Sequence, residues 1–376
     1  MPSSIELTQE LVRFNTINPP GSERACAERL AGLLEGAGFT VELIPFGEGR
    51  AQILARLGGT PDKLPLGFTG HIDTVPLGAQ PWSVDPFAAE IADGKLYGRG
   101  SSDMKSGVAA FVTACIACAD RLANTPGILL VITAGEETGC TGAEALVHAN
   151  GGLGQVGALV VAEPTGNKPL VGHKGALWLE AETKGVTAHG SMPEKGVNAV
   201  YKAARAVTAL QEFDFNVARH DVLGAPTLNV GTIQGGLNIN SVPDRAVISI
   251  DIRTIPAQSH AQIRDQLTSY LGRDVTLKTL LDAKSIWTDP HHPWVGEVFQ
   301  VARDVEGVEG VDNGLGAAPY FTDASALTPA LGSPPTVIIG PGELALAHQT
   351  DEYCQVSRIE RATEIYSQLV QNWCRI

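Results

Sequence analysis

Several short segments place histidine or acidic residues directly after apolar stretches that are typical of β-strands. These residues are His71 and Asp73, Asp103, Glu136 and Glu137, Glu163, and His348. Open α/β sheets build their sites at the carboxyl ends of strands, so residues in such positions can meet at one edge of a sheet. Each segment alone has a simpler explanation, such as a helix cap or a solvated acidic turn. Together they predict one site.

The residue types in this set are those that bind divalent metal ions. Two histidines and three carboxylates are enough for two ions that share a bridging carboxylate and a bridging hydroxide. With Asp73 set apart as a partner of His71, one carboxylate is left over. The charges of such a cluster cancel, and four nitrogen and oxygen ligands per ion favour zinc. Adjacent side chains such as Glu136 and Glu137 point apart, so one can bind metal while the other acts as a general base. In an extended chain Asp73 points the same way as His71 and can orient its ring.

The elements expected around these segments form a mostly parallel α/β layer. Apolar runs bounded by glycine or proline predict strands at 40–45, 52–57, 64–69, 127–133, 158–162 and 336–339. Helical patterns cover 4–37 with a break at 18–21, and then 106–124, 293–305 and 357–373. Continuous apolar strands are typical of strands buried on both faces, and their alternation with helices predicts an α/β fold.

From about residue 175 the pattern changes to a β-α-β-β-α-β order, which is that of a ferredoxin-like unit. The expected strands are 176–184, 227–234, 246–253 and 274–281, with helices at 197–210 and 259–271. We therefore predict a discontinuous catalytic domain of residues 1–174 and 285–376 that binds the metal ions. A ferredoxin-like α+β domain of residues 175–284 would be inserted in it.

Composition excludes several classes of partner. The chain has 376 residues and a formal net charge of −14, so an acidic surface would repel nucleic acid. Its apolar runs are too short to cross a bilayer, and its first residues lack the pattern of a signal peptide. Six cysteines in a chain of this length do not indicate a disulfide framework. We expect a cytoplasmic protein that binds neither nucleic acid nor membranes.

Three other patterns resemble sites and are better explained otherwise. Residues 152–157 fit the dinucleotide-binding pattern G-x-G-x-x-G, but they precede a predicted strand instead of following one. Cys115 and Cys118 lie within an apolar helical pattern, which favours buried small residues over a metal or redox pair. His291 and His292 lie in a turn flanked by prolines.

The combined motifs resemble the acetylornithine deacetylase and succinyl-diaminopimelate desuccinylase family, which also includes glutamate carboxypeptidases and aminoacylases. The resemblance spans the chain, from the HIDTVP motif at 71–76 to the AHQTDEY motif at 347–353. It implies that His71 and Glu163 bind one ion, Glu137 and His348 the other, and Asp103 both. It also implies that Glu136 is the general base, that Asp73 orients His71, and that the Asp103-Met104 peptide is cis.

The inserted domain carries matches of its own. Residues 188–193 (AHGSMP) resemble a lid motif whose histidine, here His189, reaches the active site of a second subunit and stabilises the oxyanion. Residues 235–243 and 251–253 resemble the segment that holds the substrate carboxylate. The resemblance thus implies substrate-binding roles for Asn240 and Arg253. We assign the same role to Gly340 and Gly342, which lie in the segment before His348. Exposed edges of a four-stranded sheet tend to be paired, which predicts a homodimer through this domain.

The expected activity is hydrolysis of the amide bond of an N-acyl amino acid, as in the deacetylases or desuccinylases. It would need two divalent ions, zinc with cobalt as a substitute, and would use a metal-bridging hydroxide with Glu136 as base. A dipeptidase or glutamate-type carboxypeptidase would use the same site. A catalytically silent binding protein would need a missing ligand or base, and none is missing. Residues 320–325 (YFTDAS) depart from the deacetylase pattern, so the acyl group and the amino acid stay open.

Overall fold

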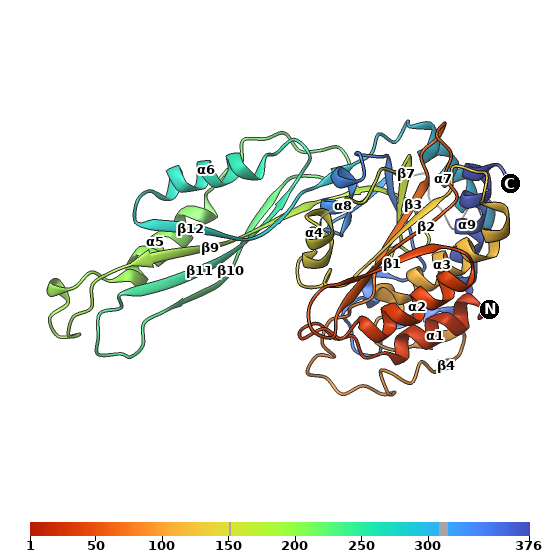
Figure 1. The fold of residues 1–376 in the computed structure, drawn as a ribbon. Coiled ribbons are helices and arrows are strands. Elements are labelled where there is room, and N and C mark those ends of the chain that lie inside the picture. Colours follow the sequence, from red (N-terminus) through yellow and green to blue (C-terminus); the bar gives the residue numbers. More distant parts are fainter. Residues whose placement is uncertain (150–151, 308–314) are drawn as a thin grey trace. The chain divides into compact units, whose positions relative to one another are not determined.

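The computed structural model describes residues 1–149, 152–307 and 315–376. Contacts divide the chain into two compact units. The first, called here the catalytic unit, comprises Met1–Gly172, Trp287–Gly316 and Thr322–Ile376. The second, called the inserted unit, comprises His173–Ile286 and Ala317–Phe321. In Figure 1 the strands of the inserted unit are green, and the catalytic unit contains both ends of the chain.

The catalytic unit is built on one large sheet with strand order β1-β2-β6-β3-β7-β15-β8-β13, and β14 pairs with β8. Its middle strands β6, β3, β7 and β15 are parallel, whereas β1, β2 and β8 pair antiparallel toward the edges. The α/β class with a mainly parallel central sheet is therefore confirmed. The strands are β1 Thr40–Pro45, β2 Ala51–Leu57, β3 Leu66–His71, β6 Ile128–Thr133, β7 Ala158–Val161, β8 Leu170–His173, β13 Ile286–Trp287, β14 Gly316–Ala318 and β15 Thr336–Ile338.

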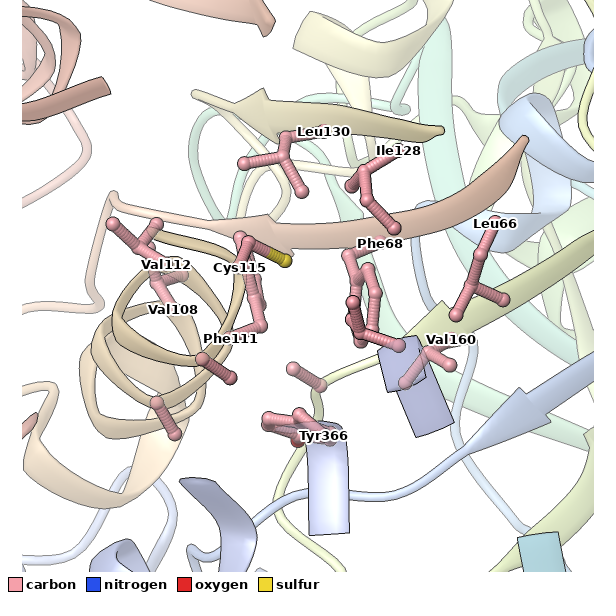
Figure 2. Close-up of a cluster of buried hydrophobic side chains, with 14 of the residues drawn as sticks. Leu66, Phe68, Val108, Phe111, Val112, Cys115, Ile128, Leu130, Val160 and Tyr366 are labelled. Carbon is pink, nitrogen blue, oxygen red and sulfur yellow. The ribbon is translucent and has the colours of Figure 1, made fainter. Parts of the chain in front are cut away.

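Helices pack against this sheet and enclose the main core. Phe68 on β3 stacks on Phe111 of α3 with ring centroids 5.7 Å apart, and Tyr366 of α9 meets Phe68 edge-on at 5.6 Å (Figure 2). The helices of the unit are α1 Ser4–Arg13, α2 Arg24–Gly36, α3 Ser106–Cys118, α4 Thr141–Val147, α7 Pro293–Glu306, α8 Ala324–Ala330 and α9 Val356–Cys374. A small sheet of order β16-β5-β4 comprises β4 Ile91–Ala92, β5 Lys95–Tyr97 and β16 Tyr353–Gln355.

The inserted unit has the ferredoxin-like order that its sequence predicts. Its antiparallel sheet runs β10-β11-β9-β12, so the first and third strands in the sequence lie at the centre. Helices α5 and α6 flank the sheet (Figure 1) and share its core. The elements are β9 Gly175–Lys184, α5 Ala199–Gln211, β10 Thr227–Gly235, β11 Arg245–Thr254, α6 His260–Leu271 and β12 Val275–Ala283.

Alternation along β9 and β11 gives this small sheet two different faces. Leu177 and Ile252 belong to the core that the sheet shares with α5 and α6, as do Leu179, Ala181, Ala246, Ile248 and Ile250. Because successive side chains of a strand point to opposite faces, Trp178, Asp251 and Arg253 lie on the face away from the helices. Each of the three is partly exposed.

The main differences from the expected elements are short pieces. Helices α4 and α8 have seven residues each and were not predicted, and neither was β8. The predicted helix 106–124 ends as α-helix at Cys118, and a 3-10 turn, Ala119–Arg121, follows. Among the described residues, no helix is long and apolar enough to span a membrane.

Candidate active site

Four neighbouring parallel strands deliver most of the predicted site residues to one edge of the large sheet. His71 is the last residue of β3, and Glu136 follows the end of β6 by three residues. Glu163 follows the end of β7 by two residues, as Gly340 follows the end of β15. Because β6, β3, β7 and β15 are adjacent and parallel, their carboxyl ends lie side by side.

Asp103 enters the same region from a tight turn, Ser101–Lys105, that leads into α3. The peptide between Asp103 and Met104 is cis, as the resemblance implied. One buried side chain, that of Glu352, holds the turn. Its Oε1 accepts the backbone N–H groups of Ser102 and Asp103 at 2.8 and 3.0 Å. Its Oε2 accepts the N–H of Gly100 at 3.0 Å and Nη1 of Arg99 at 2.6 Å.

The two oxygens of Asp103 face two different histidines. His71 Nε2 lies 3.1 Å from Oδ1 of Asp103 and 4.0 Å from Oε1 of Glu163. His348 Nε2 lies 3.5 Å from Oδ2 of Asp103 and 3.0 Å from Oε2 of Glu137. These residues thus form two groups of possible metal ligands, and Asp103 belongs to both.

Donor type and spacing in both groups fit metal ions. Two donors bound to one tetrahedral zinc ion at about 2.0–2.2 Å lie about 3.3–3.6 Å apart, close to the distances between these side chains. Oε1 of Glu137 is buried and has no hydrogen-bond partner among the described residues, which leaves it free to act as a ligand. Nitrogen and carboxylate donors suit zinc and related divalent ions.

Asp73 connects one metal-ligand group to the two adjacent glutamates. The backbone carbonyl of Asp73 accepts a hydrogen bond from Nδ1 of His71 at 3.0 Å, so Nε2 of that ring keeps its lone pair for a metal ion. The Asp73 carboxylate accepts the N–H groups of Glu136 and Glu137 at 3.2 and 3.3 Å. It also accepts Nδ2 of Asn18 at 2.8 Å, a contact that sequence reasoning missed.

The site concentrates acidic groups that are removed from water. Burial raises the pKa of Glu136 and Glu163 well above the ordinary value, and neighbouring carboxylates raise it further. Burial and the charge of Asp103 raise the pKa of Glu137 to about 7. For Asp103 itself, burial opposes ionisation, but its pKa is lowered by hydrogen bonds from His348 and His71, whose rings are protonated when no metal ion is bound. Two divalent cations would supply the positive charge that this cluster lacks.

A further carboxylate, Asp323, lies near this cluster and was not assigned a role from the sequence. It is 2% exposed and accepts a hydrogen bond from Oγ1 of Thr133, the last residue of β6, at 2.5 Å. Burial raises the pKa of Asp323 to about 6, even though the Thr133 hydrogen bond lowers it. The only sequence signal was an acid inside the segment 320–325, which departs from the family pattern.

Gly340 and Gly342 lie where two backbone segments pack too closely for a side chain. A Cβ atom on Gly340 would lie 2.2 Å from the carbonyl oxygen of Ala162, and one on Gly342 would lie 2.0 Å from that of Ser102. Glycine therefore lets this loop pack directly against the backbone beside Glu163 and Asp103. This close packing explains why both positions need glycine. Their substrate-binding role stays a prediction.

In the inserted unit, His189 and Asn240 lie in two loops that run side by side. His189 and Ser241 form an isolated antiparallel β-bridge through their backbones, and the N–H of Gly190 donates to the carbonyl of Asn240 at 2.7 Å. His189 is exposed, and its Nδ1 accepts the backbone N–H of Ser191 at 3.2 Å. In the neutral ring the proton is therefore on Nε2, which can donate to a ligand.

Arg253 lies on the helix-free face of the inserted sheet and is paired with Asp251. Its Nε and Nη2 donate to Oδ2 of Asp251 at 3.2 and 3.1 Å. Nε1 of Trp178 donates to Oδ1 of the same carboxylate at 3.0 Å. The side of the guanidinium that carries Nε is thus occupied, so a substrate carboxylate would have to approach the Nη1 and Nη2 end.

Similar proteins support a hydrolase assignment. A family model described as peptidase family M20/M25/M40 matches residues 67–372. An acetylornithine deacetylase of Proteus mirabilis is 32% identical, with 100% of this chain and 97% of that protein covered. A succinyl-diaminopimelate desuccinylase of Cereibacter sphaeroides is 31% identical, with 98% of each covered. An M20 family metallo-carboxypeptidase of Sulfolobus solfataricus has the same fold, with a TM-score of 0.81 at 18% identity over the full length of both chains.

The fold and the paired donor groups define a metal-dependent hydrolase built on an α/β sheet. The chain belongs to peptidase family M20/M25/M40. This confirms the resemblance that the motifs indicated, and it makes the protein a hydrolase rather than a silent binding protein.

Proposed function

We propose that the protein hydrolyses the amide bond of N-acyl amino acids and carries two zinc ions for this purpose. The observation that carries the proposal is that the two oxygens of Asp103 face different histidines, His71 and His348. One shared carboxylate with a separate ligand group on each side is what two neighbouring ions need. Glu163 would complete the ligands of the first ion, and Glu137 those of the second.

When bound, the ions would polarise the amide carbonyl and make water a better nucleophile near neutral pH. Glu136 would accept the proton of the attacking water and pass it to the leaving amine. Its 8% exposure limits exchange with bulk water, and the Asp73 carboxylate holds its backbone N–H. Asp73 would also keep the His71 ring in one orientation through the Nδ1 contact.

The inserted unit would bind the rest of the substrate. Arg253 would hold the α-carboxylate through its Nη1 and Nη2 atoms. Asn240, which lies in the loop beside His189, would add a hydrogen bond from the His189 end of the sheet. His189 would donate its Nε2 proton to the oxyanion that forms during attack, a type of contact worth about 3–4 kcal/mol when lost.

We further propose that the protein is a homodimer and that His189 acts in the partner subunit's active site. Strand β10 is an edge of the inserted sheet, and the loop that follows it exposes Leu237 and Ile239 almost fully, at 98% and 103%. Large apolar side chains this exposed favour contact with another protein surface. The cytoplasmic location stays a prediction, which cell fractionation tests.

The two relatives reported above support a deacylase, because their names give N-acetyl and N-succinyl amino acids as substrates. The family description also includes peptidases, and a dipeptidase would use the same ligands and the same base. Zinc-loaded and cobalt-loaded protein should be assayed on N-acetyl amino acids, N-succinyl amino acids and dipeptides. We expect N-acyl amino acids to have the highest kcat/KM. Faster turnover of dipeptides would contradict the proposal in favour of a peptidase.

A further inference from the structure

Two aromatic side chains of the inserted unit lie next to Arg253. Phe321 comes from the short segment Ala317–Phe321, which belongs to the inserted unit, and Trp178 lies on β9. Their rings meet edge-on with centroids 6.0 Å apart. The guanidinium carbon of Arg253 lies 5.9 Å from the centre of the Phe321 ring. We call Trp178 and Phe321 the aromatic pair.

The charges around the aromatic pair disfavour a second cation. The carboxylate of Asp251 already pairs with Arg253 and accepts the indole N–H of Trp178. Burial lowers the pKa of Lys174, and the charge of Arg253 lowers it further. Lys174 is thus another cation near Arg253. Because Asp251 already pairs with Arg253 and Trp178, it is not free to receive an ammonium group.

The geometry of an amino acid brings its side chain to the same corner. The α-carboxylate and the side chain are bonded to one carbon atom, so they lie within a few bonds of each other. A carboxylate held by a guanidinium at about 2.7–2.9 Å therefore leaves the side chain close enough to contact the aromatic pair. Aromatic rings attract apolar and aromatic groups at centroid separations of about 4.5–7 Å.

We propose that Phe321 and Trp178 determine side-chain specificity, and that the preferred substrates are N-acyl derivatives of apolar or aromatic amino acids rather than of cationic ones. This inference rests on the proposed function, because it takes Arg253 as the ligand of the substrate carboxylate. It goes further by giving the class of the amino acid, which the segment 320–325 left open.

The first test compares three substrates with the zinc-loaded enzyme: N-acetyl-L-phenylalanine, N-acetyl-L-ornithine and N-acetyl-L-alanine. We expect kcat/KM for the phenylalanine derivative to exceed that for the ornithine derivative by at least about tenfold, a typical value for a side-chain pocket. In Phe321→Ala, the ratio of kcat/KM for the phenylalanine derivative over that for the alanine derivative should fall by about tenfold.

A matched control removes a different aromatic ring from the same unit. Phe213 packs edge-on against Phe215 and Tyr270, with centroids 5.2 Å apart in each case. Phe213→Ala should therefore keep the phenylalanine-to-alanine ratio of the wild type, even if the unit is less stable. An equal fall of the ratio in both variants would contradict the inference.

Binding separates failure of the inference from failure of the proposed function. The affinities of N-acetyl-L-phenylalanine and N-acetyl-L-ornithine are measured by calorimetry on zinc-loaded Glu136→Gln, with and without Phe321→Ala. Turnover that prefers the ornithine derivative, with no effect of Phe321→Ala, overturns the inference and leaves the deacylase. If no N-acyl amino acid is hydrolysed, the proposed function fails. Phe321-dependent binding of the phenylalanine derivative then upholds the inference, and equal or absent binding overturns it.

Discussion

His189 and Arg253 lie at opposite ends of the inserted sheet. Arg245, at the start of β11, pairs with Lys184, the last residue of the strand that leads to His189. Arg253 is eight residues further along β11 and pairs with Ala176. At about 3.3 Å per residue these ends are about 26 Å apart, far more than the length of an amino-acid derivative. One such substrate can contact both side chains only if they come from different subunits.

Subunit mixing tests this arrangement directly. His189→Ala and Glu136→Gln should each be nearly inactive as pure proteins, because one lacks the oxyanion donor and the other lacks the base. In a mixed dimer with His189 acting in trans, one site carries both lesions and the other carries neither. We therefore expect activity to reappear when the two variants exchange subunits, measured as turnover of an N-acyl amino acid.

Arg253 provides the matched control for subunit mixing. Its partner residue Ala176 follows Gly172, the end of the first catalytic segment, by only four residues along the chain. Under the proposed function, Arg253 binds substrate in the active site of its own subunit. A mixture of Arg253→Ala with Glu136→Gln should stay inactive, because each site keeps one lesion. Recovery in this mixture, or none with His189→Ala after complete exchange, would contradict the assignment.

Glu136 and Glu137 should fail in different ways when each is replaced by glutamine. Glu137 Oε2 lies 3.0 Å from Nε2 of His348, within a ligand group, whereas Glu136 belongs to neither ligand group. Glu136→Gln should nearly abolish turnover and keep both ions. Glu137→Gln should lower the metal content as well. Elemental analysis of the two purified proteins decides the matter, and equal metal loss in both would refute the separate roles.

Glu352 should control metal affinity although it is not a ligand. Its carboxylate fixes the backbone on both sides of Ser102, including the N–H of Asp103. Glu352→Gln should weaken metal binding by about 10–100-fold, as expected when a residue that supports metal ligands is lost. Competition with a chelator measures this affinity independently of activity.

The control for Glu352 is another buried ion pair of the same unit. Glu23 is fully buried and receives two hydrogen bonds from Arg50, at 2.8 and 2.6 Å. Breaking a buried pair costs about 3–5 kcal/mol, so Glu23→Gln and Glu352→Gln should both lower the unfolding temperature. Glu23→Gln should keep its metal affinity. If both variants lose affinity equally, Glu352 acts only through general stability.

His173 should make the metal-free protein sensitive to acid. It is fully buried, and its Nε2 has no hydrogen-bond partner among the described residues. Burial lowers its pKa from 6.5 to about 4. Between these values the unfolded chain binds more protons than the folded protein, so stability decreases as the pH falls from about 6.5 to about 4. The full effect is about 3 kcal/mol.

Thermal unfolding in the presence of a chelator measures this effect. His173→Gln cannot titrate, so its unfolding temperature should fall less between pH 7 and pH 4.5 than that of the wild type. His291 is exposed in a turn, and His291→Gln should follow the wild type. If His173→Gln loses as many degrees as the wild type, His173 is not responsible for the acid sensitivity.

The sequence predicted the parts of this molecule that depend on local pattern. Buried strands such as β6 and β7 are continuous apolar runs, and the candidate ligands Glu137 and Glu163 are acids that follow their ends by four and two residues. The order of the inserted unit was also readable, because its strands alternate and its helices are long. Helices α4 and α8 were missed since seven residues are too few for a helical period to show.

Side chains that support the site could not be assigned roles, because their partners are remote in sequence. Asn18 contacts Asp73 over 55 residues, and Asp323 contacts Thr133 over 190. Glu352 contacts the backbone of Asp103 over 249 residues. The sequence around a polar loop residue does not indicate a partner so far away in the chain. The contact can be recognised only in the folded sheet, where both segments lie at the same edge.

The discontinuity of the catalytic unit has a consequence for the order of events during synthesis. The segments that carry His71, Asp103, Glu137 and Glu163 leave the ribosome before the inserted unit, whereas His348 leaves after it. A nascent chain that ends before the last segment holds one complete ligand group and only part of the other. The proposed ligands of the second ion are therefore complete only once translation has passed residue 348. Under this ligand assignment, binding of the second ion would have to wait until the last catalytic segment has been made.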